Sequence, residues 1–286
     1  MEKIRQYLNE APETRGLSDN TRQSYSNALN HLKTYCYSAL IKDLDGSFDM
    51  DRYAKHLAKT LSGQSVQLYL TITKQFFKWL GHPIEYTYRI PKDERKAIQL
   101  KKLDRWFSED DVDACLGYHF PGNGLKGLRN RIIVRLLVET GARIKELSMI
   151  DAKDIDLDTG TITLKDSKTV PRPVFVSAET LSMLEDYINR TVAGIFETEG
   201  ALFPSESQCS KVVNEMLVDL GLKNGSDERG PHTFRHYVAT WLHYEGGMDI
   251  KDIAFLLGDK PDTIVNVYIH PTPDMLRRRV QKAMGW

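Results

Sequence analysis

The sequence has few cysteines and no long hydrophobic run. Its three cysteines, Cys36, Cys115 and Cys209, are far apart and form no CxxC pair, so neither a disulfide framework nor a zinc site is expected. The most apolar stretch, residues 132–138, is short and carries Arg135 in its middle, and the N-terminus lacks an apolar signal region. These absences predict a cytoplasmic protein that spans no membrane and uses no metal or other cofactor.

An excess of charge is also missing. The 39 basic and 39 acidic side chains cancel, which excludes a histone-like protein that holds polyanions by bulk charge but leaves a local basic face possible. At 286 residues, with 41% hydrophobic and 27% charged residues, the chain has the composition of one large or two ordinary globular domains. Disorder, collagen and coiled-coil architectures are therefore not expected.

The first ninety or so residues show helical patterns and no strand pattern. N-cap residues at 18–21 open a stretch with Tyr25, Leu29, Leu32 and Tyr35 at helical spacing. Two further helical stretches are expected at residues 50–61 and 66–80, the second stopped by a Gly-x-Pro sequence at 81–83. This pattern predicts an all-helical, four-helix domain over residues 1–88.

Residues 89–105 differ in composition from the chain on either side. Their apolar content is low, and they contain one proline and a local excess of four positive charges. We interpret them as a basic linker. Such a linker either is a solvated connector or lies on phosphate groups.

Residues 106–286 mix helix and strand signals. Ser108 precedes three acids and predicts a capped helix start, and residues 128–138 read as a buried helix. Residues 155–164 alternate around a Thr-Gly turn and 173–176 form a second β pattern, which together predict a small antiparallel sheet. Helices follow from residue 177. The expected fold class is therefore mostly α with a small antiparallel β-sheet, an all-helical N-terminal domain preceding a mixed α+β domain that ends in a C-terminal helix.

Four short segments of the second domain contain residue types that suit phosphate chemistry. Each is weak alone, because a surface arginine, a solvated turn lysine or a core tyrosine is the usual reading. They are Thr140-Gly141-Ala142-Arg143-Ile144-Lys145-Glu146-Leu147, then Ser167-Lys168-Thr169 with Arg172, then Pro231-His232-Thr233-Phe234-Arg235-His236, and finally Leu256-Leu257-Gly258-Asp259 with Tyr268 nine residues after the aspartate.

The order and spacing of these segments resemble the tyrosine recombinases, also called phage-type integrases, which include the Xer-like enzymes. The family pattern is a TGxRxxEL box, a hairpin lysine, an HxxR box, and LGH followed by a tyrosine. The resemblance covers nearly the whole chain. Residues 20–25, with the sequence NTRQSY, resemble part of the family's SAM-like core-binding domain.

The resemblance implies a site-specific recombinase that cleaves and rejoins double-stranded DNA through a 3′-phosphotyrosyl intermediate. Tyr268 matches the nucleophile, and a phenolate leaves more readily than an alkoxide because a phenol is the stronger acid. Arg143 and Arg235 match the arginine pair, whose planar forks suit a doubly charged phosphoryl transition state. Lys168 matches the general acid and His232 the residue that assists proton movement at the tyrosine. Glu146, the acid of the first box, would brace an arginine.

Several assignments remain open at the level of sequence. Tyr237 and Tyr244 are rival tyrosines, although their family counterparts are structural, and Lys165 competes with Lys168 for the hairpin role. Where the family usually has histidine, or sometimes tryptophan, the chain has Asp259, which when ionised accepts hydrogen bonds only and would repel phosphate.

Three interpretations of Asp259 follow. The side chain turns away and orients an arginine or His232; or Lys260 supplies the missing donor; or the protein is a slow or inactive relative.

Two other functions compete with recombination. One is a recombinase-like DNA-binding protein that is weakly active or inactive, supported by Asp259 alone. The other is a type IB topoisomerase, which shares the tyrosine chemistry but relaxes supercoils without exchanging partners. For a recombinase, the expected partners are duplex DNA and further copies of the chain in a synaptic tetramer. The basic C-terminal helix around residues 275–284 would dock on a neighbour or pack on its own domain. The target DNA site, any accessory protein, and the choice between integration and chromosome-dimer resolution are not readable from the sequence.

Overall fold

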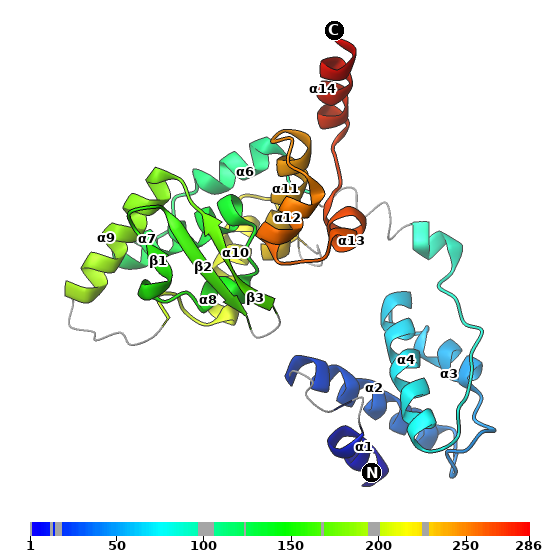
Figure 1. Ribbon diagram of the computed structural model, residues 1–286. Coiled ribbons are helices and arrows are strands. Elements are labelled where there is room, and N and C mark those ends of the chain that lie inside the picture. Colours follow the sequence, from blue (N-terminus) through cyan, green and yellow to red (C-terminus); the bar gives the residue numbers. More distant parts are fainter. Residues whose placement is uncertain are drawn as a thin grey trace. The chain divides into compact units, whose positions relative to one another are not determined.

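A computed structural model describes residues 2–11, 14, 19–96, 106–122, 124–166, 169–193, 201–224 and 229–286. The chain divides into two compact units, an N-terminal unit of residues 1–100 and a C-terminal unit of residues 101–286 (Figure 1). Helices predominate in both.

The N-terminal unit contains four long or medium helices in its described part. They are α1 (Glu2–Glu10), α2 (Asp19–Ser38), α3 (Met50–Leu57) and α4 (Gly63–Trp79). Asp49 and Ser62 cap α3 and α4 by accepting hydrogen bonds from backbone N–H groups three residues on. The helical patterns at 25–35, 50–61 and 66–80 are thereby confirmed.

Aromatic side chains dominate the core of this unit. Tyr7, Tyr53, Phe76 and Phe77 are fully buried, and the Tyr7 and Phe76 rings meet edge to face at 5.2 Å between centroids. Arg22, in the segment that resembles the core-binding domain, donates to the carbonyl of residue 8 and so ties α2 to α1.

The chain that leaves α4 stays on the N-terminal unit before it enters the predicted linker. The Asp51 carboxylate accepts hydrogen bonds from the backbone N–H groups of Thr87 and Tyr88. Residues 92–96 are helical, and Glu94 accepts a 2.6 Å bond from the N–H of Gly63 at the start of α4. Residues 97–105 lie outside the described residues, so the interpretation of 89–105 as a basic linker stays a prediction.

In its described part the C-terminal unit combines helices with one small sheet. These helices are α6 (Glu109–Leu116), α7 (Leu125–Thr140), α8 (Ile144–Ser148), α9 (Ala178–Ala193), α10 (Glu206–Asp219), α11 (Pro231–Tyr244), α12 (Ile250–Leu257), α13 (Pro261–Thr263) and α14 (Pro273–Met284). Ser108 and Asp111 form the capping box expected at the start of α6. The helix expected at 128–138 is confirmed and begins three residues earlier, because Gly124 takes the N-cap position.

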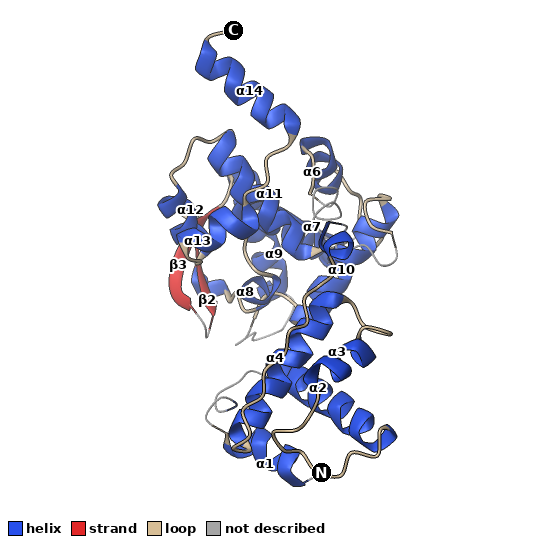
Figure 2. Cartoon of the chain, turned by 90° about the vertical axis from the view of Figure 1, so that its right-hand side faces the viewer, coloured by secondary structure: helices blue, strands red, loops and turns tan. Residues whose placement is uncertain are grey.

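The described strands of this unit form one three-stranded antiparallel sheet, as predicted. The strands are β1 (Ile155–Asp156), β2 (Thr161–Asp166) and β3 (Thr169–Phe175), in the order β1-β2-β3, after the short 3-10 helix η2 (Ala152–Asp154). β3 begins earlier than its sequence pattern, at Thr169, and lies beside α12 (Figure 2). Leu164 pairs with Arg172 and Ile162 with Val174, and all four side chains are buried on the same face.

Two apolar clusters position the site. The larger one surrounds α7, whose Ile132, Ile133 and Leu137 are fully buried. A smaller cluster joins α11, α12 and the π-helical turn η3 (Ile264–Tyr268) through buried side chains that include Leu257 and Ile264. The helices within the described residues are all too short or too polar to traverse a bilayer.

Candidate active site

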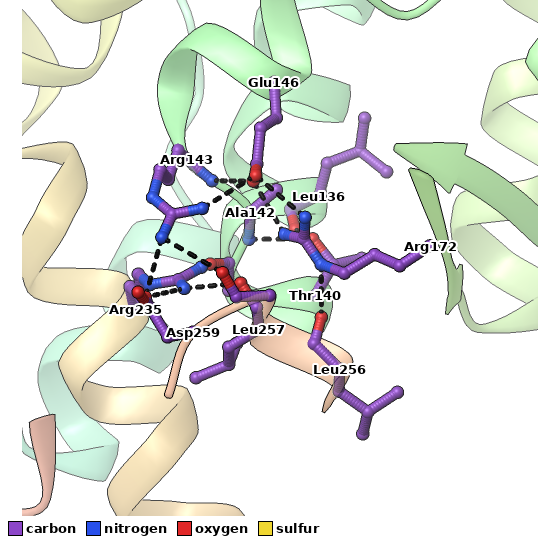
Figure 3. Close-up of polar contacts among 12 residues, drawn as sticks. Leu136, Thr140, Ala142, Arg143, Glu146, Arg172, Arg235, Leu256, Leu257 and Asp259 are labelled. Carbon is purple, nitrogen blue, oxygen red and sulfur yellow. Dashed lines mark hydrogen bonds and ion pairs between the residues drawn. The ribbon is translucent and has the colours of Figure 1, made fainter. Parts of the chain in front are cut away.

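Charged side chains from the boxes of the sequence come together in the described part of the C-terminal unit. Arg143 is the N-cap of α8, Arg235 lies in the first half of α11, and Asp259 follows α12. Arg172 approaches from β3 (Figure 3). Residues from four elements far apart in sequence therefore converge on one polar cluster.

Two glycines make this convergence possible. Gly141 and Gly258 end α7 and α12 in the left-handed conformation, with φ of 60° and 64°. A Cβ at residue 141 would lie 2.7 Å from the Leu257 side chain, and one at residue 258 would lie 2.7 Å from Arg172 Nη1. Both the backbone conformation and the close approach require glycine, which explains why the TG and LG pairs precede the functional residues.

A buried ion pair forms the base of the cluster. Arg172 Nη1 and Nη2 donate to the two carboxylate oxygens of Glu146, both at 2.8 Å, and the exposed fractions of the two side chains are 3% and 0%. Arg143 donates to the same carboxylate from its backbone N and from Nη1. Burial raises the pKa of Glu146, but the hydrogen bonds and charges of the two arginines outweigh it and hold the pKa below its ordinary value.

The two arginines of the recombinase pattern meet at one carboxylate oxygen. Arg143 Nη2 donates to Asp259 Oδ2 at 2.7 Å, and Arg235 Nη2 donates to the same oxygen at 2.5 Å. Arg235 also donates to the backbone carbonyls of Gly141 and Leu257. The geometry therefore presents two guanidinium groups to a single anionic group.

Tyr268 lies beside this pair. The Arg235 guanidinium carbon is 5.0 Å from the centroid of the Tyr268 ring, and the His236 ring meets it edge to face at 4.8 Å. Thr240 donates to the backbone carbonyl of Tyr268 and accepts from the N–H of His270, which fixes the backbone on both sides of the tyrosine. Tyr268 is the last residue of a π-helical turn, a distortion that recurs at functional sites.

His232 lies one turn before Arg235 on α11, and its side chain is open to solvent. Partial desolvation, together with the charges of Arg235 and Arg143, lowers the pKa of His232 below its ordinary value. The lowered pKa favours the neutral imidazole, which can accept a proton.

The hairpin lysine remains a prediction. Lys168 lies outside the described residues. The rival Lys165, on β2, donates to the buried carboxylate of Asp154 in η2. That ion pair gives Lys165 a structural partner.

The rival tyrosines have different surroundings from Tyr268. Tyr237 packs against both apolar clusters, and burial raises its pKa to about 12. The ring of Tyr244 lies 4.7 Å from the guanidinium carbon of Arg279.

The sequence analysis assigned no role to Arg172. An arginine at an inward-facing strand position, in register with Leu164, was nevertheless a readable signal.

Comparison with known proteins identifies the family. Residues 105–275 match the model of the phage integrase family, and residues 4–82 match the phage integrase N-terminal SAM-like domain. Tyrosine recombinase XerA of Saccharolobus solfataricus is 31% identical over 242 residues, covering 84% of this chain and 74% of the relative. Tyrosine recombinase XerA of Pyrococcus furiosus is 28% identical over 285 residues, covering 95% and 90%.

Solved structures agree on the fold. XerH recombinase bound to a palindromic difH substrate superposes with a TM-score of 0.73 at 18% identity, covering 98% of this chain and 85% of that one. The Tn1549 transposon integrase in complex with a circular intermediate DNA gives 0.71 at 16% identity, covering 98% and 99%. The chain thus belongs to the phage integrase family of tyrosine recombinases, enzymes that break and rejoin DNA.

Proposed function

We propose that this chain binds double-stranded DNA at a specific site and transfers a backbone phosphodiester to Tyr268. One observation carries the proposal: two arginine side chains converge on one anionic oxygen beside a tyrosine, with Arg235 in contact with both. A phosphate at that place would receive hydrogen bonds from two planar guanidinium groups within reach of a phenol. That is the arrangement that a metal-independent phosphoryl transfer requires.

The proposed cleavage step transfers a backbone phosphoryl group from a 5′-oxygen to Tyr268. The Tyr268 oxygen forms a bond to phosphorus while the bond from phosphorus to the 5′-oxygen breaks, leaving a 3′-phosphotyrosyl link and a 5′-hydroxyl. The phenol proton passes toward His232, which its lowered pKa keeps neutral. Lys168 gives a proton to the leaving 5′-oxygen. Arg143 and Arg235 stabilise the added negative charge of the transition state.

Rejoining reverses these steps with a 5′-hydroxyl as nucleophile. The phosphotyrosyl link retains the energy of the phosphodiester bond, so no ATP is needed. If the incoming hydroxyl belongs to a different strand, the result is recombination, either integration and excision or dimer resolution. If it belongs to the same strand, the result is relaxation as in a type IB topoisomerase.

DNA binding is assigned to both units. XerH, the Tn1549 integrase and a lambda integrase dimer have all been solved with DNA, and each shares this fold. We propose that the N-terminal unit is the core-binding domain, the C-terminal unit the catalytic domain, and residues 89–105 a linker along the DNA. Phosphate contacts would supply most of the affinity, so binding should weaken steeply with salt.

We propose that the chain forms a tetramer on synapsed DNA and that the C-terminal helix α14 mediates contacts between its copies. The start of α14 is held by its own unit, since Met275 is buried and Arg278 pairs with Glu109 and Glu245. The rest of the helix extends away from that unit (Figures 1 and 2). Leu276 and Val280, spaced four residues apart, are 44% and 50% exposed. We propose that this apolar stripe, with Met284, packs on a second copy of the chain.

Trapping the covalent intermediate tests the central proposal. The purified protein is mixed with sheared DNA from its source organism and quenched in SDS, and the adduct is isolated and its DNA sequenced. We expect an adduct with the wild type and with Tyr237→Phe and Tyr244→Phe, the two matched controls, but none with Tyr268→Phe. Sequencing the trapped DNA also identifies the target site.

Two results would contradict the proposal. An adduct that survives Tyr268→Phe would assign the nucleophile to another residue. Salt-sensitive DNA binding without any adduct, even on nicked substrates that prevent religation, would establish the binding-protein alternative. Relaxation of supercoiled DNA without recombinant products would instead point to topoisomerase activity.

A further inference from the structure

This inference rests on the proposed function and concerns Asp259, where the family usually has histidine or sometimes tryptophan. Asp259 Oδ2 accepts hydrogen bonds from Nη2 of both Arg143 and Arg235 (Figure 3). These are the guanidinium nitrogens that two converging forks would offer to a phosphate oxygen. A carboxylate oxygen therefore lies where we expect a substrate phosphate oxygen to bind.

The arginines do not need Asp259 to hold their positions. Glu146 accepts from Arg143 Nη1 and from its backbone N. Arg235 donates to the backbone carbonyls of Gly141 and Leu257, both supplied by helix ends. Because each guanidinium is fixed by other acceptors, the main effect of Asp259 is to occupy the remaining donors, rather than to orient them.

The exposed fractions place Asp259 nearer to solvent than the deeper of the two arginines. The Arg235 side chain is 0% exposed, whereas 19% of Asp259 and 21% of Arg143 are exposed. The remaining nitrogen of Arg235, Nε, is buried and has no hydrogen-bond partner among the described residues. A phosphate that approaches from solvent thus meets Asp259 before it can reach Arg235.

We propose that Asp259 is a resident anion: its carboxylate occupies the scissile-phosphate position between Arg143 and Arg235, and DNA must displace it before Tyr268 attacks. Two anions cannot share the same donors without repulsion, since an ionised carboxylate can only accept. Displacement needs only side-chain rotation, because the Asp259 N–H donates to the Ala254 carbonyl and holds the backbone at the end of α12.

The charges of the cluster give the direction of the effect. Three guanidinium groups, those of Arg143, Arg172 and Arg235, face the two carboxylates of Glu146 and Asp259, which leaves one net positive charge for the phosphate. Neutralising Asp259 leaves two. The variant Asp259→Asn should therefore bind an oxyanion more tightly and cleave DNA faster than the wild type.

The first test uses inorganic phosphate and no DNA. We expect calorimetric titration of the full chain to show phosphate affinity about tenfold or more higher for Asp259→Asn than for the wild type. Asp262→Asn, which removes the same charge at an exposed position in α13, should leave the affinity unchanged. Adding Arg143→Gln to Asp259→Asn should abolish the gain. Equal or weaker phosphate binding by Asp259→Asn would overturn the proposal.

The second test uses nicked duplexes carrying the trapped target site, with either a phosphate or a neutral methylphosphonate at the scissile position. A resident anion penalises only the charged substrate. Replacing Asp259 by Asn or His should raise the rate of adduct formation on the phosphate duplex about tenfold. The ratio of the rate on the phosphate duplex to the rate on the methylphosphonate duplex should rise by a similar factor. If the ratio is unchanged, or if Asp259→Asn is slower on both duplexes, Asp259 is a positioning residue and the proposal fails.

The two tests separate this inference from the proposed function. Tighter phosphate binding by Asp259→Asn, with no adduct from the wild type or any variant, would support the resident-anion proposal and refute cleavage by this chain. Adduct formation by the wild type with no gain in either assay would do the opposite.

Discussion

The buried pair of Glu146 and Arg172 allows a quantitative test of how the site is built. Arg172→Met removes two 2.8 Å charge-assisted hydrogen bonds from the Glu146 carboxylate and leaves it with the donors of Arg143 alone. Two such bonds at about 1.5–3 kcal/mol each agree with the 3–5 kcal/mol found when one partner of a buried pair is removed. We expect the C-terminal unit to lose about 3–5 kcal/mol of unfolding free energy.

Urea unfolding followed by hydrogen-exchange mass spectrometry measures this loss, because peptides of the C-terminal unit are read separately from the N-terminal unit. Arg190→Met is the matched control. It breaks an ion pair with Asp186 in which both side chains are about half exposed, and should cost less than about 1 kcal/mol. The double variant Glu146→Gln/Arg172→Met should lose less than the sum of the single variants, since it leaves neither charge stranded. A loss for Arg172→Met no larger than that for Arg190→Met would refute the reasoning.

The same pair predicts a pH dependence whose sign is fixed. The arginines hold the pKa of Glu146 below its ordinary value of 4.5 in the folded protein. The pair therefore contributes its full stability above pH 4.5, and that stability is lost as the pH falls through the lower folded value. In Arg172→Met the folded pKa of Glu146 moves up toward or past 4.5, so Glu146 should contribute less to the acid-induced loss of unfolding free energy than it does in the wild type. Identical acid unfolding profiles for the two proteins would contradict this account.

Three further predictions follow from other parts of the site. Gly258→Ala should destabilise the C-terminal unit by at least about 1–2 kcal/mol in the same urea assay, since residue 258 has φ of +64° and a Cβ would press on the neighbouring guanidinium; an unchanged midpoint would contradict this. Because the pKa of His232 is lowered from 6.5, the single-turnover rate of adduct formation should fall in acid with a midpoint below pH 6.5. A fall centred above pH 6.5 would exclude His232 as the base. Leu276→Glu/Val280→Glu should leave adduct formation on single sites intact and abolish synaptic complexes in analytical ultracentrifugation, whereas unchanged assembly would remove α14 from the interface.

The sequence alone determined the elements and the family. Helical periodicity, the Gly-x-Pro stop at 81–83, and the alternation around residue 160 are local patterns, so they predicted α3, α4 and the antiparallel sheet. The glycine pairs and the order of the boxes are also local, and they predicted a tyrosine recombinase, which the family matches confirm. Local sequence sets the backbone conformation, and it therefore also determines which side chains follow the ends of α7 and α12.

Only the tertiary structure decided how the charged side chains pair. Glu146 and Arg172 are 26 residues apart, and Asp259 is 116 residues from Arg143, so no periodicity links them. The sequence left Asp259 free to orient an arginine or His232, or to leave Lys260 as the donor. Its rotamer depends on where two packed helix ends place the guanidinium groups, and such long-range geometry exists only after the core has formed.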